Sequence, residues 1–270
     1  MMQTMFGPWA VVTGASSGIG EAFARALAAD GLHLVLVARR TERLTALGAE
    51  LSRTHDVEHR VLTVDLARPD GPATVVEATT GTDVGLLVSN AGAGHPGRFV
   101  EQDVDDLHRR LRLNAVSHLE LSHAFGRRLA ARGHGGMVLV SALGASAGIP
   151  NMAHEAGSKA YVDALGTALH HELAGAGVKV LVMRPGNVDT AVIDSFGLDR
   201  ADLPLRPITP AAAVAETLAA LRRGRAAHLP DRRMRLMNRL IPTPLAIRMN
   251  GRMLGQGAAR LAALGAGSTS

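Results

Sequence analysis

The chain has 270 residues, of which 47% are hydrophobic and 30 are glycine, which suits one compact domain with a large core. It contains no cysteine, which excludes disulfides, thiolate nucleophiles and cysteine-ligated metals and points to a cytoplasmic location. The formal charge is +5, and the positive charge is concentrated in residues 222–260, which contain ten arginines and one acid. The whole chain has one Trp and one Tyr, so it lacks aromatic side chains on which bases could stack. No nucleic-acid partner is therefore expected.

Short apolar runs alternate with amphipathic stretches along the chain, which is typical of a parallel sheet covered by helices on both faces. Strands are predicted at 9–13, 33–38, 58–63, 85–89, 136–141, 178–184 and 226–229. Helices are predicted at 19–30, 40–54, 71–80, 104–132, 151–174 and 210–222. This order predicts an α/β, Rossmann-type doubly wound sheet of seven parallel strands with right-handed crossovers.

The domain organisation follows from this pattern. We expect residues 1–230 to form a dinucleotide-binding domain that includes a catalytic helix and a substrate loop at about 191–208. Residues 231–270 form a basic C-terminal extension of the same domain, with a frayed end at 265–270. No apolar run reaches the roughly 18 residues that span a bilayer, and the segment before the first strand is too short for a secretory signal.

A glycine-rich turn follows the first predicted strand and opens a helix. It reads Thr13-Gly14-Ala15-Ser16-Ser17-Gly18-Ile19-Gly20. Glycines at this place let the backbone approach a pyrophosphate, and the helix N-terminus offers N–H groups and a positive dipole end. The turn therefore predicts a dinucleotide site.

The second predicted strand ends at Ala38 and is followed by Arg39 and Arg40, where an acid would hydrogen-bond the ribose of NAD. Two guanidiniums fit a 2′-phosphate instead, because arginine offers planar, bidentate donors with a fixed charge. The predicted cofactor is therefore NADP(H), although these arginines could also begin a solvated helix. After the third strand, Asp65 and Leu66 could hold an adenine edge, or Asp65 could cap a turn.

The chain resembles the short-chain dehydrogenase/reductase family over residues 9–229. The shared motifs are the turn at 13–20, Ser89-Asn90-Ala91-Gly92, Asn114, Gly157-Ser158-Lys159, and Pro185-Gly186-Asn187-Val188-Asp189-Thr190. The resemblance implies that Asn90, Ala91 and Gly92 line the cofactor and that Lys159 holds the nicotinamide ribose. It also implies that the nicotinamide is surrounded by Pro185, Gly186, Val188 and Thr190.

The family reduces carbonyls with a tyrosine acid, a lysine, a serine that holds the substrate oxygen and an asparagine that anchors a water. Counting back from Lys159, the tyrosine position holds Glu155, and Ala142 stands at the serine position, thirteen residues before it. A different register pairs Ser141 with His154, but His154 lies about 140° around the helix from Lys159, whereas Glu155 shares its face.

We expect Glu155, Lys159 and Asn114 at the catalytic site, with Ser141 as a further candidate if the strand end bends. Tyr161 lies two positions beyond Lys159, on the other side of the helix, and is expected to pack rather than react. A Glu155 carboxylate paired with Lys159 would remain ionised near neutral pH, so it could accept hydrogen bonds but not donate one to a carbonyl oxygen.

Three enzymatic hypotheses and one non-enzymatic hypothesis follow. The first is an NADP(H)-dependent reductase of an activated C=C bond, such as an enone; a plant monoterpenoid reductase of this family carries a glutamate at the same place and reduces a double bond. The second is a carbonyl reductase or alcohol dehydrogenase with Ser141, His154 or a substrate group as the acid. The third is a non-redox isomerase, cyclase or dehydratase with Glu155 as base. The fourth is a catalytically silent subunit.

The segment 191–208 is expected to cover the substrate pocket, and its apolar side chains favour an apolar small molecule. A homodimer or homotetramer is expected through the helices that carry Asn114 and Lys159. The tail at 234–264 could complete that assembly, cover the pocket or lie on an anionic membrane, and we favour them in that order. Its prolines and glycines argue against one long helix.

Overall fold

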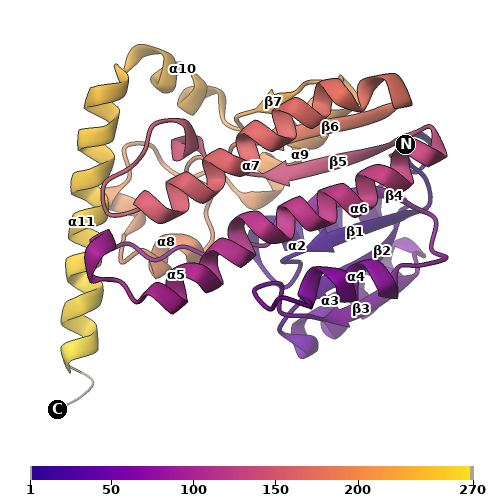
Figure 1. The fold of residues 1–270 in the computed structure, drawn as a ribbon, viewed down its shortest axis with the longest axis horizontal. Helices are drawn as coiled ribbons and strands as arrows, with labels where there is room; N and C mark the ends of the chain where they lie inside the picture. Colours follow the sequence, from indigo (N-terminus) through magenta and orange to yellow (C-terminus); the bar gives the residue numbers. More distant parts are fainter. Residues whose placement is uncertain (1, 268–270) are drawn as a thin grey trace.

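The computed structural model describes residues 2–267, without the side chains of residues 146 and 265–267. Its centre is a parallel sheet of seven strands in the order β3-β2-β1-β4-β5-β6-β7 (Figure 1). The strands are β1 Trp9–Thr13, β2 His33–Ala38, β3 His59–Thr63, β4 Val84–Ser89, β5 Gly135–Val140, β6 Val178–Met183 and β7 Ala227–His228. The two halves wind outward from β1 and β4, which confirms the predicted doubly wound fold.

The α-helices include the six predicted ones, to within a few residues, and four more at residues 2–6, 191–195, 232–240 and 243–267. They are α1 Met2–Phe6, α2 Gly18–Ala29, α3 Thr41–His55, α4 Gly71–Ala78, α5 Val104–Leu111, α6 Ser117–Arg132, α7 Ala153–Glu172, α8 Ala191–Ser195, α9 Pro210–Arg222, α10 Arg232–Leu240 and α11 Thr243–Gly267. The short helix α1 was not predicted. Its Met2 and Phe6 are fully buried in the core.

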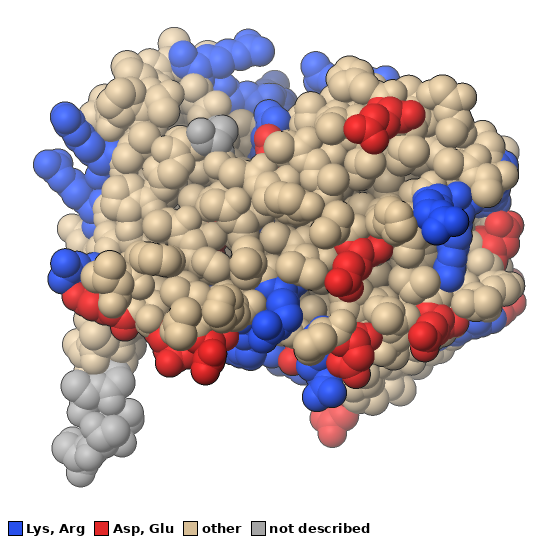
Figure 2. Space-filling model, in the orientation of Figure 1, with Lys and Arg blue, Asp and Glu red and all other residues tan. Residues whose placement is uncertain are grey.

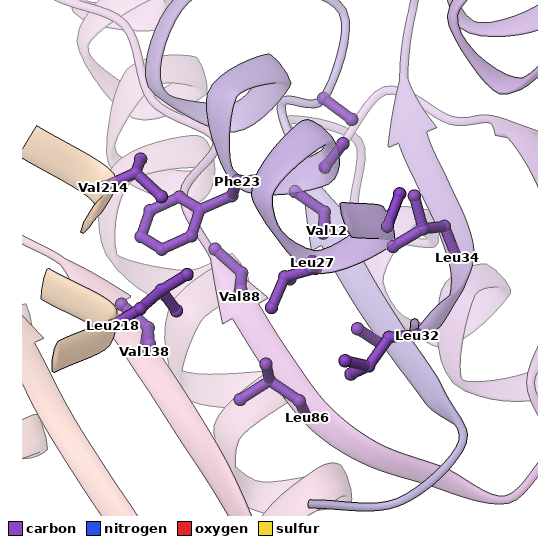
Figure 3. Packing of buried hydrophobic residues seen from close by; sticks show 14 of the residues in the cluster. Val12, Phe23, Leu27, Leu32, Leu34, Leu86, Val88, Val138, Val214 and Leu218 are labelled. Carbon is purple, nitrogen blue, oxygen red and sulfur yellow. The ribbon is translucent and has the colours of Figure 1, made fainter. Parts of the chain in front are cut away.

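Both faces of the sheet are covered by helices. One core cluster joins α2, α3 and α9 to the sheet, and Figure 3 shows Phe23 of α2 close to Val214 of α9 above the strands. A second cluster joins α4, α6 and α7 to the other face, with Phe125 of α6 fully buried. The central strands β1, β4 and β5 are buried along their whole length because helices cover both of their faces.

The predicted helix over residues 104–132 runs without a break in the structure, but a π-helical turn divides it into α5 and α6. A π-helical turn at Arg112–Val116 separates α5 from α6 and contains the fully buried Asn114. A π turn inserts one extra residue per turn and shifts the helix face, and such turns are frequent at functional sites. Sequence periodicity did not reveal this division.

The tail forms two helices rather than one, as its prolines predict, but its glycines do not interrupt α11. Pro242 precedes α11 and Pro244 lies in its first turn, where proline is tolerated. Gly251 and Gly255 lie inside the helix, so the expectation that they would break it was wrong. Figure 2 shows basic side chains on the upper left of one face, where Figure 1 draws α10 and the start of α11.

Helix α11 packs against the segment expected to cover the substrate. Its Leu254 joins Met152, Ile193 and Leu198 in a small buried cluster. A Cβ atom on Gly257 would lie 2.1 Å from the carbonyl oxygen of Phe196, so only glycine permits this approach of helix and segment. None of the helices within residues 2–267 is long and apolar enough to cross a membrane.

The close approach at Gly257 predicts a stability defect in the variant Gly257→Ala. The added methyl must push α11 away from residue 196, and overpacking of this kind costs about 1–3 kcal/mol. Urea unfolding would measure this cost, and tryptic cleavage at Arg252 would report detachment of α11. The control is Gly157→Ala, because a Cβ at this exposed helical position meets nothing within 4 Å. Equal stability of the two variants would contradict the packing argument.

Candidate active site

The glycine-rich turn lies between β1 and α2, at the carboxyl edge of the sheet. A Cβ atom on Gly20 would lie 2.2 Å from the carbonyl oxygen of Gly14, so the turn closes only around glycine. Helix α2 begins at Gly18, and the side chain of Ser17 makes no capping hydrogen bond to it. Its first N–H groups are therefore available to an anion, in the direction favoured by the helix dipole.

Thr13 joins this turn to the end of β4. Its Oγ1 accepts hydrogen bonds from the backbone N–H groups of Asn90 at 2.9 Å and Ala91 at 3.0 Å, and the Asn90 side chain donates to the Thr13 carbonyl at 2.9 Å. A Cβ on Gly18 would lie 3.1 Å from the methyl group of Thr190. Three predicted cofactor segments, from three places in the chain, therefore meet at one edge of the sheet.

The remaining residues predicted to surround the nicotinamide lie after β6. The Pro185 carbonyl accepts a hydrogen bond from the Leu143 N–H at 3.0 Å, and Val188 is buried and pairs with Ile208 in a single β-bridge. Gly186 faces Met234 of α10, whose Cγ would lie 3.1 Å from an added Cβ. This segment therefore connects the carboxyl end of β6 to the segment at 191–208 and to the tail.

Arg40 lies across the glycine-rich turn. Its Nε and Nη2 donate to Ser16 Oγ at 3.1 and 2.8 Å, and Nη2 also donates to Ser17 Oγ at 2.7 Å. Burial lowers the pKa of Arg40 below its ordinary value, and the guanidiniums of Arg43 and Arg39 lower it further. Clustered positive charge beside two hydroxyls is a donor set that fits a 2′-phosphate.

Asp65 and Leu66 have local roles in the structure. Asp65 Oδ1 accepts a hydrogen bond from the Ala67 N–H at 3.0 Å, which is the turn-capping role left open by the sequence. The side chain of Leu66 is buried in the core cluster beneath α4 and α6. Ile19, the apolar residue of the glycine-rich turn, packs against the cluster on the other face.

Asn114 and Lys159, both expected at the catalytic site, lie close together beside Gly92. A Cβ atom on Gly92 would lie 3.2 Å from both Asn114 Oδ1 and Lys159 Nζ. Lys159 Nζ donates to the Val140 carbonyl at 2.8 Å, and burial lowers the pKa of Lys159 to about 8. An amine with this pKa can change its protonation state near neutral pH, which an ordinary lysine does not do.

Ser141 lies beside this pair, but its hydroxyl is already engaged. Ser141 Oγ donates to the Lys159 carbonyl at 2.8 Å, so the side chain anchors the end of β5 to α7. Tyr161 was expected to pack rather than react, and 43% of it is exposed in the single chain. His154 retains a buried Nε2 atom with no hydrogen-bond partner among the described residues.

The expected pairing of Glu155 with Lys159 is not what the structure shows, because Arg110 of α5 takes that place. Glu155 is 6% exposed, and its Oε1 lies 3.3 Å from Arg110 Nε and accepts the backbone N–H of His95 at 3.2 Å. Glu155 Oε2 is buried without a partner in the described part of the chain. The buried guanidinium compensates the charge of the carboxylate.

Sequence reasoning missed Arg110, although a signal for it exists. Leu107, Arg110 and Asn114 follow one another at spacings of three and four residues, and all three are buried. This is the spacing of one helix face, so a charged residue stood at a core position of an amphipathic helix. Buried charges are paired or functional, and Arg110 therefore merited a search for its partner.

Comparison with known proteins decides the family. A family profile described as short chain dehydrogenase matches residues 8–201. This chain belongs to the short chain dehydrogenase family.

Curated relatives of this short chain dehydrogenase include reductases and an inactive homologue. The 7beta-hydroxysteroid dehydrogenase of Collinsella aerofaciens is 30% identical over 189 residues, covering 70% of this chain and 72% of the relative. A very-long-chain 3-oxoacyl-CoA reductase of Neurospora crassa is 34% identical, and the rat inactive hydroxysteroid dehydrogenase-like protein 1 is 32% identical. Both alignments cover 69% of this chain and 58% of the relative, so the chain spans less than two thirds of their length.

Solved structures of the family are also similar. A short-chain dehydrogenase from Sphingobium yanoikuyae in complex with NADPH has a TM-score of 0.78 and 30% identity, covering 86% of this chain and 92% of the other. A putative gluconate 5-dehydrogenase from Beutenbergia cavernae with bound NADP has a TM-score of 0.75 and 31% identity, covering 83% and 94%. Both neighbours hold the phosphorylated form of the dinucleotide.

The geometry of Arg40 predicts cofactor discrimination. Arg40→Ala should weaken NADPH binding by about 10- to 100-fold, because it removes a charged, multidentate donor, and should change NADH binding far less. Calorimetric titration with both dinucleotides measures the difference. Arg43→Ala is the comparison, because it removes a neighbouring positive charge but none of the hydrogen bonds to Ser16 and Ser17, and it should weaken NADPH binding less than Arg40→Ala. Equal weakening of NADPH and NADH in Arg40→Ala would contradict the 2′-phosphate assignment.

Proposed function

We propose that this short chain dehydrogenase is an NADP(H)-dependent reductase of an apolar small molecule, that its acceptor is an activated C=C bond such as that of an enone, and that Lys159 supplies the proton. One observation carries the proposal. Glu155, at the position where the family has its tyrosine acid, lies buried between Arg110 and the His95 N–H. A carboxylate held in this way accepts hydrogen bonds and has no proton to give to a carbonyl oxygen.

The cofactor is NADP(H), and the donor set of the structure fits it. The glycine-rich turn and the start of α2 would hold the pyrophosphate, and Arg40 with Ser16 and Ser17 would hold the 2′-phosphate. The segment from Pro185 to Thr190 would lie against the nicotinamide. When bound, the reduced nicotinamide supplies a hydride.

The residues of the site would then stabilise the negative charge on the substrate and supply a proton to it. As hydride adds to the β-carbon of an enone, the electron pair of the C=C bond moves toward the oxygen and forms an enolate. The Lys159 ammonium would stabilise that negative charge and transfer its proton to the α-carbon, and the neutral amine would regain a proton from water. Asn114 would keep Gly92 and the neighbouring backbone in place beside Lys159.

The substrate side is apolar, which favours an apolar substrate. Ile193 and Leu198 of the covering segment pack with Met152 and with Leu254 of α11, and Phe196 lies against them. A covering segment built on such a cluster would favour rings and acyl chains over sugars. The relatives named as hydroxysteroid and 3-oxoacyl-CoA enzymes act on such molecules by name.

Carbonyl reduction is the second candidate, and the names of these relatives favour it. The acid would be Lys159, whose pKa of about 8 permits proton donation, or His154, whose buried Nε2 atom has no partner in the described residues. Ser141 is less suited, because its hydroxyl already donates to the Lys159 carbonyl. The names of the relatives indicate classes of substrate, but they do not indicate what Glu155 does in this chain.

We also propose a homodimer or homotetramer built on the helices that carry Asn114 and Lys159. Leu111 and Leu119 are 39% and 41% exposed near the π turn, and Tyr161 is 43% exposed on α7. Large apolar side chains that remain exposed on neighbouring helices favour contact with a second copy.

The pKa of Lys159 predicts the pH dependence. Proton donation needs the ammonium, so reduction by NADPH should be constant below pH 7 and fall about tenfold for each unit above pH 8. The neighbouring His118 does not titrate in this range, because burial and the charge of Lys159 hold its pKa well below the ordinary value. Lys159→Arg should remove the fall between pH 7 and 9. A rate that rises across this range would contradict Lys159 as the acid.

The acceptor is tested with NADPH carrying deuterium at the transferable position, supplied with matched ring enones and their saturated ketones. Deuterium at the β-carbon, with turnover of enones alone, supports the proposal. Deuterium on the carbonyl carbon of both substrates would contradict C=C reduction and support carbonyl reduction instead. Tight NADPH binding without oxidation of any acceptor would overturn the redox function and leave a silent subunit or a Glu155-based non-redox reaction. No binding of NADPH would overturn the cofactor assignment.

A further inference from the structure

The loop at residues 93–97, which follows β4, is tied down by side chains from three directions. Asn114 exchanges two hydrogen bonds with the backbone of Ala93, at 2.9 and 2.7 Å. Glu155 Oε1 accepts the His95 N–H at 3.2 Å, and Gln102 Nε2 donates to the Gly97 carbonyl at 3.0 Å. The Gly97 N–H also donates to the Asn151 carbonyl at 2.8 Å, so the side chains hold the part of the loop that lies between β4 and this backbone contact.

This loop forms part of the wall on the substrate side. A Cβ atom on Gly94 would lie 2.9 Å from Phe196 Cε1 and 3.1 Å from Met152 Cε, so the phenyl ring of the covering segment rests directly on the Gly94 backbone. A displacement of the loop by a fraction of an ångström therefore moves the surface on which Phe196 rests. Positioning errors of about 1 Å cost on the order of 100-fold in rate when they reach the reacting groups.

Arg110 connects the anchors of this loop. It is 5% exposed, and its Nε lies 3.3 Å from Glu155 Oε1, while Nη2 donates to Gln102 Oε1. Its Nη1 lies 2.8 Å from Asp106 Oδ2 on the same helix. Two of the three side chains that hold the loop are therefore themselves held by one buried guanidinium.

The charges make this arrangement interdependent. A buried carboxylate or guanidinium left alone is strongly destabilising, whereas the two together compensate each other. Arg110 Nε and Glu155 Oε2 still have no hydrogen-bond partner within the described residues, so the pair is held in place without full hydrogen bonding. A pair kept in the interior under these conditions serves position more than stability.

We propose that Arg110 is a positioning residue that fixes loop 93–97 through Glu155 and Gln102, and that Glu155 acts through this loop rather than by proton transfer. The inference rests on the proposed function in one respect, because it assigns the loop to the wall of the reductase substrate pocket. The loop geometry itself is independent of which acceptor is reduced.

A double-mutant cycle tests the proposal with Glu155→Gln, Arg110→Met and the combination of both. Glu155→Gln keeps an acceptor for the His95 N–H but leaves Arg110 with only the partly exposed Asp106 as counter-charge, and Arg110→Met leaves the buried Glu155 carboxylate with none from Arg110. Each single variant should raise the KM for the acceptor about tenfold or more and lower the Tm by about 6 °C or more. The double variant should recover most of both losses, and the Kd for NADPH should stay within about twofold throughout.

Catalytic participation of Glu155 gives a different pattern. A general acid or base at this position would lose kcat in Glu155→Gln, and Arg110→Met would not restore it in the double variant. That outcome would overturn the positioning role. Arg109→Gln is the matched control, because Arg109 immediately precedes Arg110 on α5 and forms an exposed ion pair with Asp106 at 3.0 Å. It should change neither KM nor Tm.

Two further measurements keep the test decisive. If the single variants fail to fold, Gln102→Leu removes an anchor of the loop and one hydrogen bond of Arg110 but keeps both charges of the pair, so it should raise KM and lower the Tm less than either charge variant. If the protein turns over no acceptor at all, the proposed function fails, but the recovery of Tm in the double variant still decides whether Arg110 and Glu155 act as a unit. Additive losses of Tm in the cycle would overturn the coupling.

Discussion

The site depends on a small set of hydrogen bonds at the point where the strand order reverses. Thr13 ends β1 and binds the two backbone N–H groups that follow β4, so the strand ends on either side of the reversal cannot separate. The glycine-rich turn, the Asn90–Gly92 segment and, through Gly92, the pair Asn114 and Lys159 are all placed relative to that junction. An apolar residue at this buried position would leave the two N–H groups without a hydrogen-bond acceptor, whereas the hydroxyl of Thr13 accepts both.

Most of the fold could be predicted from the sequence because its signals are local. Buried parallel strands give continuous apolar runs such as 84–89, and the turn residues between them are glycines and prolines. The π turn around Asn114 was not predicted, and the hydrogen bonds that Asn114 makes there join it to Ala93, 21 residues away, which helical spacing does not reveal. The continuity of α11 through Gly251 and Gly255 was also missed, because these glycines pack closely against residues 150 and 151, which are distant in the sequence.

The site could be predicted only in part. Motif residues such as Asn114 and Lys159, which come from separate parts of the sequence, lie together beside Gly92. The partner of Glu155 could not be found by helical spacing along α7, because Arg110 comes from another helix. Helical spacing identifies the residues that share a face with Glu155, such as Lys159, but says nothing of what a second helix brings to that face.

The contact between α11 and the segment at 191–208 has a kinetic consequence. Backbone meets backbone at Gly197 and Gly257, and Arg260 binds Asp202, so the covering segment cannot swing outward without carrying the tail helix or detaching from it. On the proposed function, entry and exit of a substrate would move this whole unit rather than a loop alone. Residence time would then depend on residues 243–267, far in the sequence from the glycine-rich turn at 13–20.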